Sequence, residues 1–134
     1  MTTIDASAKS PTPGDAGFLI LYVADPRASA AFWSRLTGRP VLEEADTFAM
    51  LGLREGVMLG LWRREGVVPA ASASGGGMEI CWPVGSAEVV DATHARWAAM
   101  GLTILQSPCE MDFGRTFTAA DPDGHRLRVF CPAG

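Results

Sequence analysis

Two successive segments of this sequence predict the same order of secondary structure, and this repetition constrains the fold more than any other feature. In the first segment, the apolar run from Phe18 to Val23 (FLILYV) is short and rich in strand-forming residues, as in a buried strand. Asp25 as N-cap and Pro26 at the first helical position then predict a helix that stops at Gly38. Three short strands are expected after this helix, over residues 40–44, 47–53 and 57–63.

The second segment repeats this order. A strand from Met78 to Trp82 precedes Ser86, the N-cap of a helix that extends to Met100 and stops at Gly101. Three further strands are expected near residues 103–106, 115–120 and 125–131, the last two joined by the type I turn sequence DPDG. Aligned with each other, the segments place Phe18 on Glu79, Gly38 on Gly101, Gly56 on Gly124 and Trp62 on Phe130. Each segment is therefore predicted to be a βαβββ module.

The two modules are separated by a flexible linker and preceded by a polar tail. Residues 17–66 and 77–132 form the modules of one domain that spans residues 17–134. Residues 67–76 are the expected linker, because the sequence from Pro69 to Gly77 (PAASASGGG) is low in complexity. Residues 1–16 are rich in Thr, Ser, Pro and Ala without periodicity, and we expect them to be disordered.

The composition favours a folded cytoplasmic protein that binds neither nucleic acid nor membranes. A chain of 134 residues that is 48% hydrophobic can bury a substantial core. Its longest apolar run, around Phe18 to Ala24, is far shorter than the ~20 residues of a membrane span. The ten arginines and Lys9 are scattered and the formal net charge is -4, so no basic stripe is available for nucleic acid. Three cysteines without a CxxC pair indicate free thiols in a reducing compartment.

Two motifs accompany this module order. The first strand ends in VADPRASAAFW, and the last hairpin has the sequence FGRTFTAADPDGHRLRVF. Over nearly all of residues 17–132 the chain resembles the vicinal oxygen chelate superfamily, which includes glyoxalases, ring-cleaving dioxygenases and bleomycin-resistance proteins; its last hairpin is most similar to that of phenazine-antibiotic resistance proteins. The resemblance implies an α+β fold in which two βαβββ modules form an eight-stranded glyoxalase-like sheet around a cleft, and it implies a homodimer.

Side chains alternate between the two faces of a strand, so the register that the resemblance implies divides each strand into a cleft face and a helix-covered face. On the first strand, Leu19, Leu21 and Val23 are expected beneath the helix. Leu127 and Val129 of the last strand suit a core, whereas the arginines beside them do not. The side chains expected in the cleft are Phe18, Ile20, Tyr22, Met58, Gly60, Trp62, Glu79, Cys81, Arg126, Arg128 and Phe130.

The resemblance also locates the metal-ligand positions of metal-using relatives, in the first and last strands of each module. This sequence has Phe18, Gly60, Glu79 and Arg128 there, of which only Glu79 can bind a cation. A catalytic zinc site needs three protein ligands from His, Cys or carboxylates, and an arginine would repel the ion. Even with Cys81 as a soft second donor, the ligands are too few. We therefore predict no metal and no cofactor.

Several conspicuous residues have a structural interpretation beside a functional one. Arg128 either binds the carboxylate of a ligand or forms a structural bridge to Glu79, and Trp62 either lines the cleft or packs. Cys81 lacks a nearby base and is expected to be a small buried apolar residue. The remaining expectations place His94 and His125 at the surface or in a turn, Trp33 and Trp97 in the core or an interface, and Trp82 toward the helices.

Three functions remain open from the sequence, and we favour the first. It is a non-catalytic binding protein that sequesters a planar aromatic compound, such as a phenazine-type antibiotic. Its ligand contacts would be Phe18, Tyr22, Met58, Trp62, Glu79 and Arg128. The second function is a metal-dependent lyase or dioxygenase of the glyoxalase type, which the ligand positions disfavour. The third is a metal-independent isomerase or hydrolase with Glu79 as general base, since an apolar cleft would raise the pKa of a carboxyl group.

Overall fold

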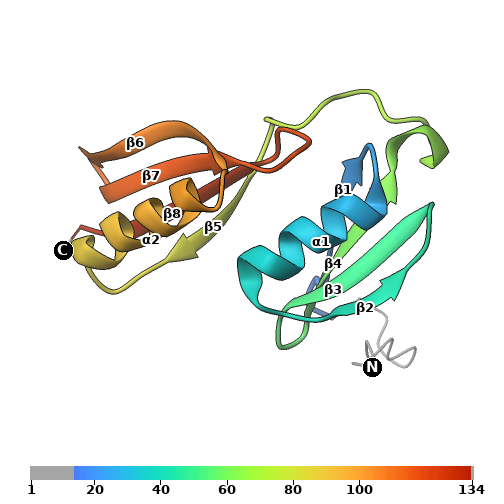
Figure 1. Cartoon of the computed structure of the whole chain (residues 1–134), viewed down its shortest axis with the longest axis horizontal. Helices are drawn as coiled ribbons and strands as arrows, with labels where there is room; N and C mark the ends of the chain where they lie inside the picture. Colours follow the sequence, from blue (N-terminus) through green and yellow to red (C-terminus); the bar gives the residue numbers. More distant parts are fainter. Residues whose placement is uncertain (1–13, 134) are drawn as a thin grey trace. The chain divides into compact units, whose positions relative to one another are not determined.

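The computed structural model describes residues 14–133, so most of the predicted disordered tail, residues 1–13, lies outside the described part of the chain. The chain divides into two compact units, with the boundary between residues 72 and 73 (Figure 1). Each unit holds a four-stranded sheet and one α-helix in the order βαβββ. The predicted α+β fold of two βαβββ modules with eight strands is therefore confirmed.

The first unit pairs its first and last strands directly. It consists of β1 (Phe18–Val23), α1 (Pro26–Thr37), β2 (Val41–Glu44), β3 (Phe48–Arg54) and β4 (Val57–Arg63), followed by the short 3-10 helix η1 (Arg64–Gly66). The strands lie in the order β1-β4-β3-β2, with β1 parallel to β4 and the other neighbours antiparallel. The parallel pair aligns Phe18 with Met58 and Tyr22 with Trp62, so these side chains lie on the same face.

The signals predicted for both ends of α1 form as expected. The Asp25 carboxylate accepts hydrogen bonds from two backbone N–H groups of the first turn, at 3.1 and 3.3 Å, and Pro26 takes the first helical position. At the other end Gly38 adopts a φ of 74°, and its N–H donates to the carbonyl of Ser34 at 2.8 Å. The helix thereby presents the fully buried Trp33 to the core.

The second unit has the same topology. It consists of β5 (Glu79–Pro83), α2 (Ala87–Ala99), β6 (Thr103–Met111), β7 (Gly114–Ala120) and β8 (Arg126–Pro132). Its strands lie in the order β5-β8-β7-β6, again with a parallel first and last strand. The Ser86 hydroxyl accepts a hydrogen bond from the backbone N–H of Val89 at 3.3 Å, which confirms the predicted N-cap. Within residues 14–133, neither helix is long and apolar enough to cross a lipid bilayer.

Strand β6 is longer than the sequence predicted. The prediction ended near Gln106, yet the strand continues through Ser107 and Pro108 to Met111. Proline lacks an N–H for the ladder and is tolerated at the edge of a sheet or at an irregularity in pairing. Both conditions hold here, because β6 is the outer strand beside β7 and its register shifts between Gln106 and Cys109.

The DPDG turn between β7 and β8 also forms. The Gly124 N–H donates to the carbonyl of Asp121 at 3.1 Å and closes the turn. The Asp121 carboxylate accepts hydrogen bonds from the backbone N–H groups of Asp123 (2.9 Å) and His125 (2.8 Å). Burial raises the pKa of Asp121, and the backbone hydrogen bond from His125 opposes this effect. The hydrogen bond from His125 also confirms that this residue lies directly after the turn, as predicted.

In each unit the helix covers one face of the sheet, and the core of that unit lies between the helix and the sheet (Figure 1). Leu21 and Val23 on the covered side of β1 are 3% and 0% exposed, whereas Ile20 and Tyr22 on the opposite side are 45% and 37% exposed. The predicted alternation is thus confirmed for β1. In the second unit, Trp82 contacts Trp97 of α2 edge to face with ring centroids 5.3 Å apart, which confirms that Trp82 faces the helix.

The faces opposite α1 and α2 are named here the first and second helix-free faces. The first carries Phe18, Ile20, Tyr22, Phe48, Met50, Met58, Gly60 and Trp62. The second carries Glu79, Cys81, Gln106, Thr116, Thr118, Arg126, Arg128 and Phe130.

We predict that Gly114→Ala destabilises the protein by at least about 2 kcal/mol. Gly114 has a φ of 135°, and a Cβ there would overlap the backbone carbonyl of Cys131 in β8, which cannot move without breaking the sheet. Gly85→Ala is the matched control, because a Cβ at Gly85 meets nothing within 4 Å. Urea unfolding should leave the control within about 1 kcal/mol of wild type; equal losses for both variants would contradict the prediction.

Candidate functional site

The first helix-free face is aromatic. Tyr22 of β1 and Trp62 of β4 are aligned in register and contact edge to face, with ring centroids 6.3 Å apart and ring planes at 83°. Ile20 lies beside them on β1 and is among the most exposed apolar side chains of the described chain. A surface of this kind can stack against a planar ring and remove apolar area from water.

Gly60 leaves room for two phenylalanine rings at the centre of this face. A Cβ at Gly60 would lie 2.8 Å from ring carbons of both Phe18 and Phe48, so any larger residue would push the rings aside. Met50, the register partner of Gly60 on β3, lies on the same face and is buried. The sequence reasoning missed Phe48 and Met50 because it considered only the first and last strands of each module.

The predicted contact residues of this face differ in how deeply they are buried. Met58 lies on the first helix-free face, as expected from its register, but it is only 2% exposed. Phe18 and Trp62 are both half-buried. Tyr22 is therefore the exposed aromatic side chain of the predicted set on this face, and the half-buried Trp62 contacts its ring.

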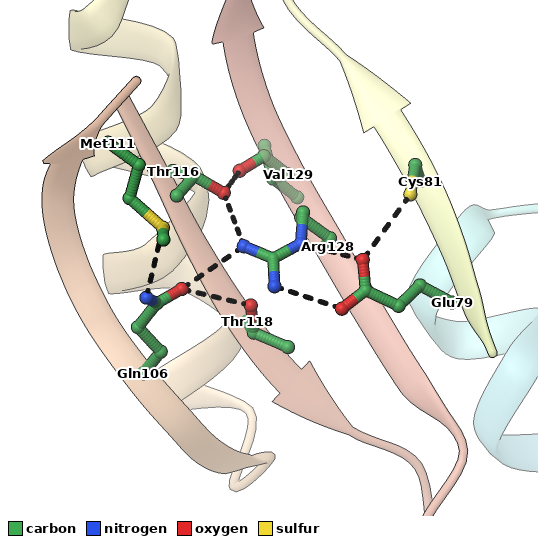
Figure 2. Close-up of polar contacts among 8 residues, drawn as sticks. All are labelled: Glu79, Cys81, Gln106, Met111, Thr116, Thr118, Arg128 and Val129. Carbon is green, nitrogen blue, oxygen red and sulfur yellow. Dashed lines mark hydrogen bonds and ion pairs between the residues drawn. The ribbon is translucent and has the colours of Figure 1, made fainter. Parts of the chain in front are cut away.

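The second helix-free face is built around an ion pair. The Arg128 guanidinium donates from Nε to Oε1 of Glu79 at 2.7 Å and from Nη2 to Oε2 at 2.9 Å (Figure 2). This is a bidentate pair between neighbouring parallel strands β8 and β5. The side chains of Arg128 and Glu79 are 17% and 29% exposed, so the pair is largely shielded from water. Of the two interpretations left open for Arg128, the structure contains the bridge to Glu79.

The opposite side of the guanidinium is held as well. Nη1 donates to Oε1 of Gln106 and to Oγ1 of Thr116, both at 3.1 Å, from strands β6 and β7 (Figure 2). The Thr116 hydroxyl in turn donates to the carbonyl of Val129 at 2.9 Å, and Thr118 donates to Gln106 at 3.2 Å. Arg128 therefore links all four strands of the sheet, with Gln106 and Thr116 as partners that sequence reasoning missed.

Aromatic side chains border this polar network. The Phe113 ring lies 5.8 Å from the guanidinium carbon of Arg128, close enough for a cation–π contact. Phe113 also contacts Phe130 edge to face at 5.9 Å between ring centroids. Because Phe113 is an exposed residue, the network lies beside an apolar ring that a ligand can reach.

The ion pair changes the chemistry expected of Glu79. The hydrogen bond from the Arg128 guanidinium lowers the pKa of Glu79 below its ordinary value of 4.5, and desolvation by burial opposes this without reversing it. The hypothesis of a general base required a raised pKa, so that expectation is wrong. Its physical error was to consider an apolar cleft without the cation beside the carboxylate.

The thiol of Cys81 is also placed differently from the prediction. Cys81 was expected to be buried, but it is exposed on the second helix-free face, with Sγ 4.0 Å from Oε1 of Glu79. Partial burial of the thiol and the nearby Glu79 charge raise the pKa of Cys81, which disfavours the thiolate.

The other conspicuous residues are mostly structural. Trp33 and Trp97 lie in the core, in agreement with prediction. His94 was expected at the surface; it is half-buried, and its ring contacts that of Phe117 at 5.3 Å between centroids.

The residues at the metal-ligand positions implied by the resemblance do not fit a metal ion. Phe18 and Gly60 offer no donor atom, and both oxygens of Glu79 accept hydrogen bonds from Arg128. A cation bound at Glu79 would have to displace the guanidinium and lie next to its charge. Within residues 14–133, no group of three or more His, Cys, Asp or Glu side chains is arranged to hold a metal ion.

Comparisons with known proteins relate this arrangement to a family. Residues 18–130 match the glyoxalase-like domain family. A protein of Agrobacterium tumefaciens with a solution NMR structure is 48% identical and superposes with a TM-score of 0.82, covering 90% of this chain and 99% of its own. A glyoxalase-related enzyme from Fulvimarina pelagi shares the fold at 23% identity and a TM-score of 0.75, covering 90% of this chain and 92% of its own. A lactoylglutathione lyase from Agrobacterium tumefaciens does so at 18% identity and a TM-score of 0.70, covering 91% and 96%. A search among curated proteins found no match.

We predict that Arg128→Met lowers the free energy of unfolding by about 2 to 3 kcal/mol at pH 7, because it leaves the Glu79 charge shielded and unpaired. The pKa of Glu79 is lowered in the folded state, so the stabilisation is present above the ordinary value of 4.5 and is lost as the pH falls through the folded-state pKa. The difference between wild type and variant should therefore shrink in urea titrations below about pH 4.5.

Arg115→Met is the control for this variant. Arg115 also lies on the second sheet and pairs with Asp91 at 2.8 Å and Glu110 at 3.4 Å, but both acidic partners are exposed. Solvent screens such pairs, so the control should lose less stability than Arg128→Met. Equal losses, or a loss for Arg128→Met that does not change with pH, would contradict a stabilising role of the Glu79 pair.

Proposed function

Because this chain belongs to the glyoxalase-like domain family of the vicinal oxygen chelate superfamily, we propose that it is a small-molecule binding protein that sequesters a planar aromatic compound, such as a phenazine-type antibiotic, without catalysis. The proposed contacts are those expected from the sequence: Phe18, Tyr22, Met58, Trp62, Glu79 and Arg128. We assign the stacking to Tyr22 and Trp62, whose rings are in contact, and a supporting role to the half-buried Phe18 and the buried Met58.

The observation that carries this proposal is the exposed aromatic surface of the first helix-free face. Tyr22 and Trp62 are in contact, and Ile20 beside them is 45% exposed. A soluble domain rarely leaves neighbouring large apolar side chains exposed without a ligand or partner for them. Aromatic rings add about 0.5 to 1.5 kcal/mol per contact beyond the burial of their area, which favours a ligand that is itself planar.

Two further observations support binding without catalysis. The carboxylate of Glu79 is neutralised by Arg128 and has a lowered pKa, so it is a weak base at neutral pH. The thiol of Cys81 has a raised pKa and is a weak nucleophile. The second helix-free face thus offers polar contacts, while its two candidate reactive groups, Glu79 and Cys81, are held in unreactive forms.

The proposal includes a cytoplasmic location and a homodimer. Cys81, Cys109 and Cys131 are free cysteines, as is usual in a reducing compartment. Ile20 of the first helix-free face is 45% exposed and is not among the proposed ligand contacts, and it favours association with a second copy, because such association would remove it from water.

We predict that light scattering at micromolar concentration gives twice the mass of the chain. Ile20→Glu should shift the mass toward that of one chain, because it puts a charge into the apolar surface. Val89→Glu, at an exposed position of α2, is the control and should leave the mass unchanged. A wild type that scatters as one chain, with and without ligand, would remove the dimer from the proposal.

For ligand binding, we predict that Trp62→Ala and Tyr22→Ala each weaken the binding of phenazine by about two- to tenfold, the loss of one aromatic contact. Isothermal titration calorimetry measures the dissociation constants. Val89→Ala removes an exposed apolar side chain from α2, on the far side of the second sheet, and should leave them unchanged. If phenazine and related planar compounds do not bind the wild type, or bind Trp62→Ala equally well, the proposed function is wrong.

A further inference from the structure

On the second helix-free face, Glu79 already occupies the edge of the Arg128 guanidinium that would bind the carboxylate of a ligand. We propose that this face selects neutral planar ligands over acidic ones, and that Glu79 is the residue that determines this specificity. The inference rests on the proposed function, since it concerns which planar ligands the protein would bind.

The first step is the geometry of the guanidinium. A carboxylate binds arginine best through two parallel N–H···O bonds along one edge. In this chain Glu79 occupies the Nε and Nη2 edge of Arg128 with bonds of 2.7 and 2.9 Å. A ligand carboxylate would have to displace a carboxylate that is covalently part of the protein and therefore loses little freedom on pairing.

The second step concerns the other edge of the Arg128 guanidinium, at Nη1. Both N–H groups of Nη1 are engaged, by Gln106 and by Thr116. Thr116 is fully buried and is itself held by its bond to the Val129 carbonyl, so this partner has no room to turn away. Rotating Arg128 toward an acidic ligand would break bonds to three other side chains on three strands.

The third step concerns the N–H groups of Arg128 that remain available to a ligand. Among residues 14–133, partners engage four of the five guanidinium N–H groups, which leaves one on Nη2. One N–H can donate to a neutral carbonyl oxygen, whereas a carboxylate there would lie beside the charge of Glu79. Arg126 is a second cation near Glu79, but it is exposed and solvent screens its charge.

The experiment compares two probes of nearly the same shape, the neutral phenazine-2-carboxamide and the anionic phenazine-2-carboxylate, by isothermal titration calorimetry at pH 7; the amide also carries N–H donors that the carboxylate lacks. We expect the wild type to bind the amide at least about tenfold more tightly than the carboxylate. In Glu79→Gln the edge of Arg128 is free for the ligand, and the preference for the amide should fall by about ten- to a hundredfold, the effect of a hydrogen bond between charged groups.

Glu110→Gln is the matched control. Glu110 is another carboxylate of the second sheet that pairs with an arginine, Arg115, and its removal changes the net charge by the same amount. The control should keep the wild-type preference, which separates a local effect at Arg128 from an effect of total charge.

The outcomes distinguish this inference from the proposed function. If the wild type binds both probes equally, or the carboxylate more tightly, the inference is overturned while the proposed function stands. A folded Glu79→Gln with an unchanged preference overturns it as well. If neither probe nor phenazine binds, both fail together. Should Glu79→Gln not fold, the wild-type preference alone decides, because that measurement needs no variant.

Discussion

Each four-stranded sheet of this protein has two faces but only one helix, so one face of each sheet is left without a helix and can carry a binding site. A sheet face covered by an amphipathic helix must be apolar, and Leu21, Val23, Leu127 and Val129 meet that requirement on the covered sides. The opposite faces are free of this constraint, so their residues can differ between two units of the same topology. They do differ, since one face is aromatic and the other is ionic.

The contrast is greatest at one register position. Gly60 is aligned with Ile20 between β4 and β1, and Arg128 is aligned with Cys81 between β8 and β5, so the two residues hold equivalent places in their modules. Without a side chain at Gly60, the rings of Phe18 and Phe48 both lie close to the position that a Cβ would take. With a long side chain at Arg128, the equivalent space holds a guanidinium bonded to Glu79, Gln106 and Thr116.

Much of the fold was predictable because its signals are local. The caps at Asp25 and Gly38 and the strand alternation each depend on a few neighbouring residues. The extension of β6 past Pro108 was not predictable, because only the sheet shows that this strand lies at an edge.

The positions of the candidate site residues were predictable from the sequence, but their charge, pKa and exposure were less so. The register placed Glu79, Cys81 and Arg128 on one face, and the structure brings these three together. The state of each group depends on contacts across four strands, so the pKa of Glu79 and the exposure of Cys81 were misjudged. Applying the same alternation to β3 and β7 would have found Phe48 and Thr116, because side chains of paired strands share a face.

A single side chain, Arg128, accounts for the chemistry that the second helix-free face lacks. Arg128 donates to both oxygens of Glu79, so this carboxylate is not available to a cation. The same pair lowers the pKa of Glu79, whereas a general base would need it raised. It also leaves the Nε and Nη2 edge of the guanidinium occupied by Glu79, so an acidic ligand cannot bind there. A buried pair of this kind adds little net stability compared with apolar residues of similar size, so stability alone does not explain it. Its clearest physical effect is to present a polar surface whose central pair carries no net charge, beside the exposed ring of Phe113. The proposed ligand, which is planar, uncharged and left chemically unchanged, matches such a surface.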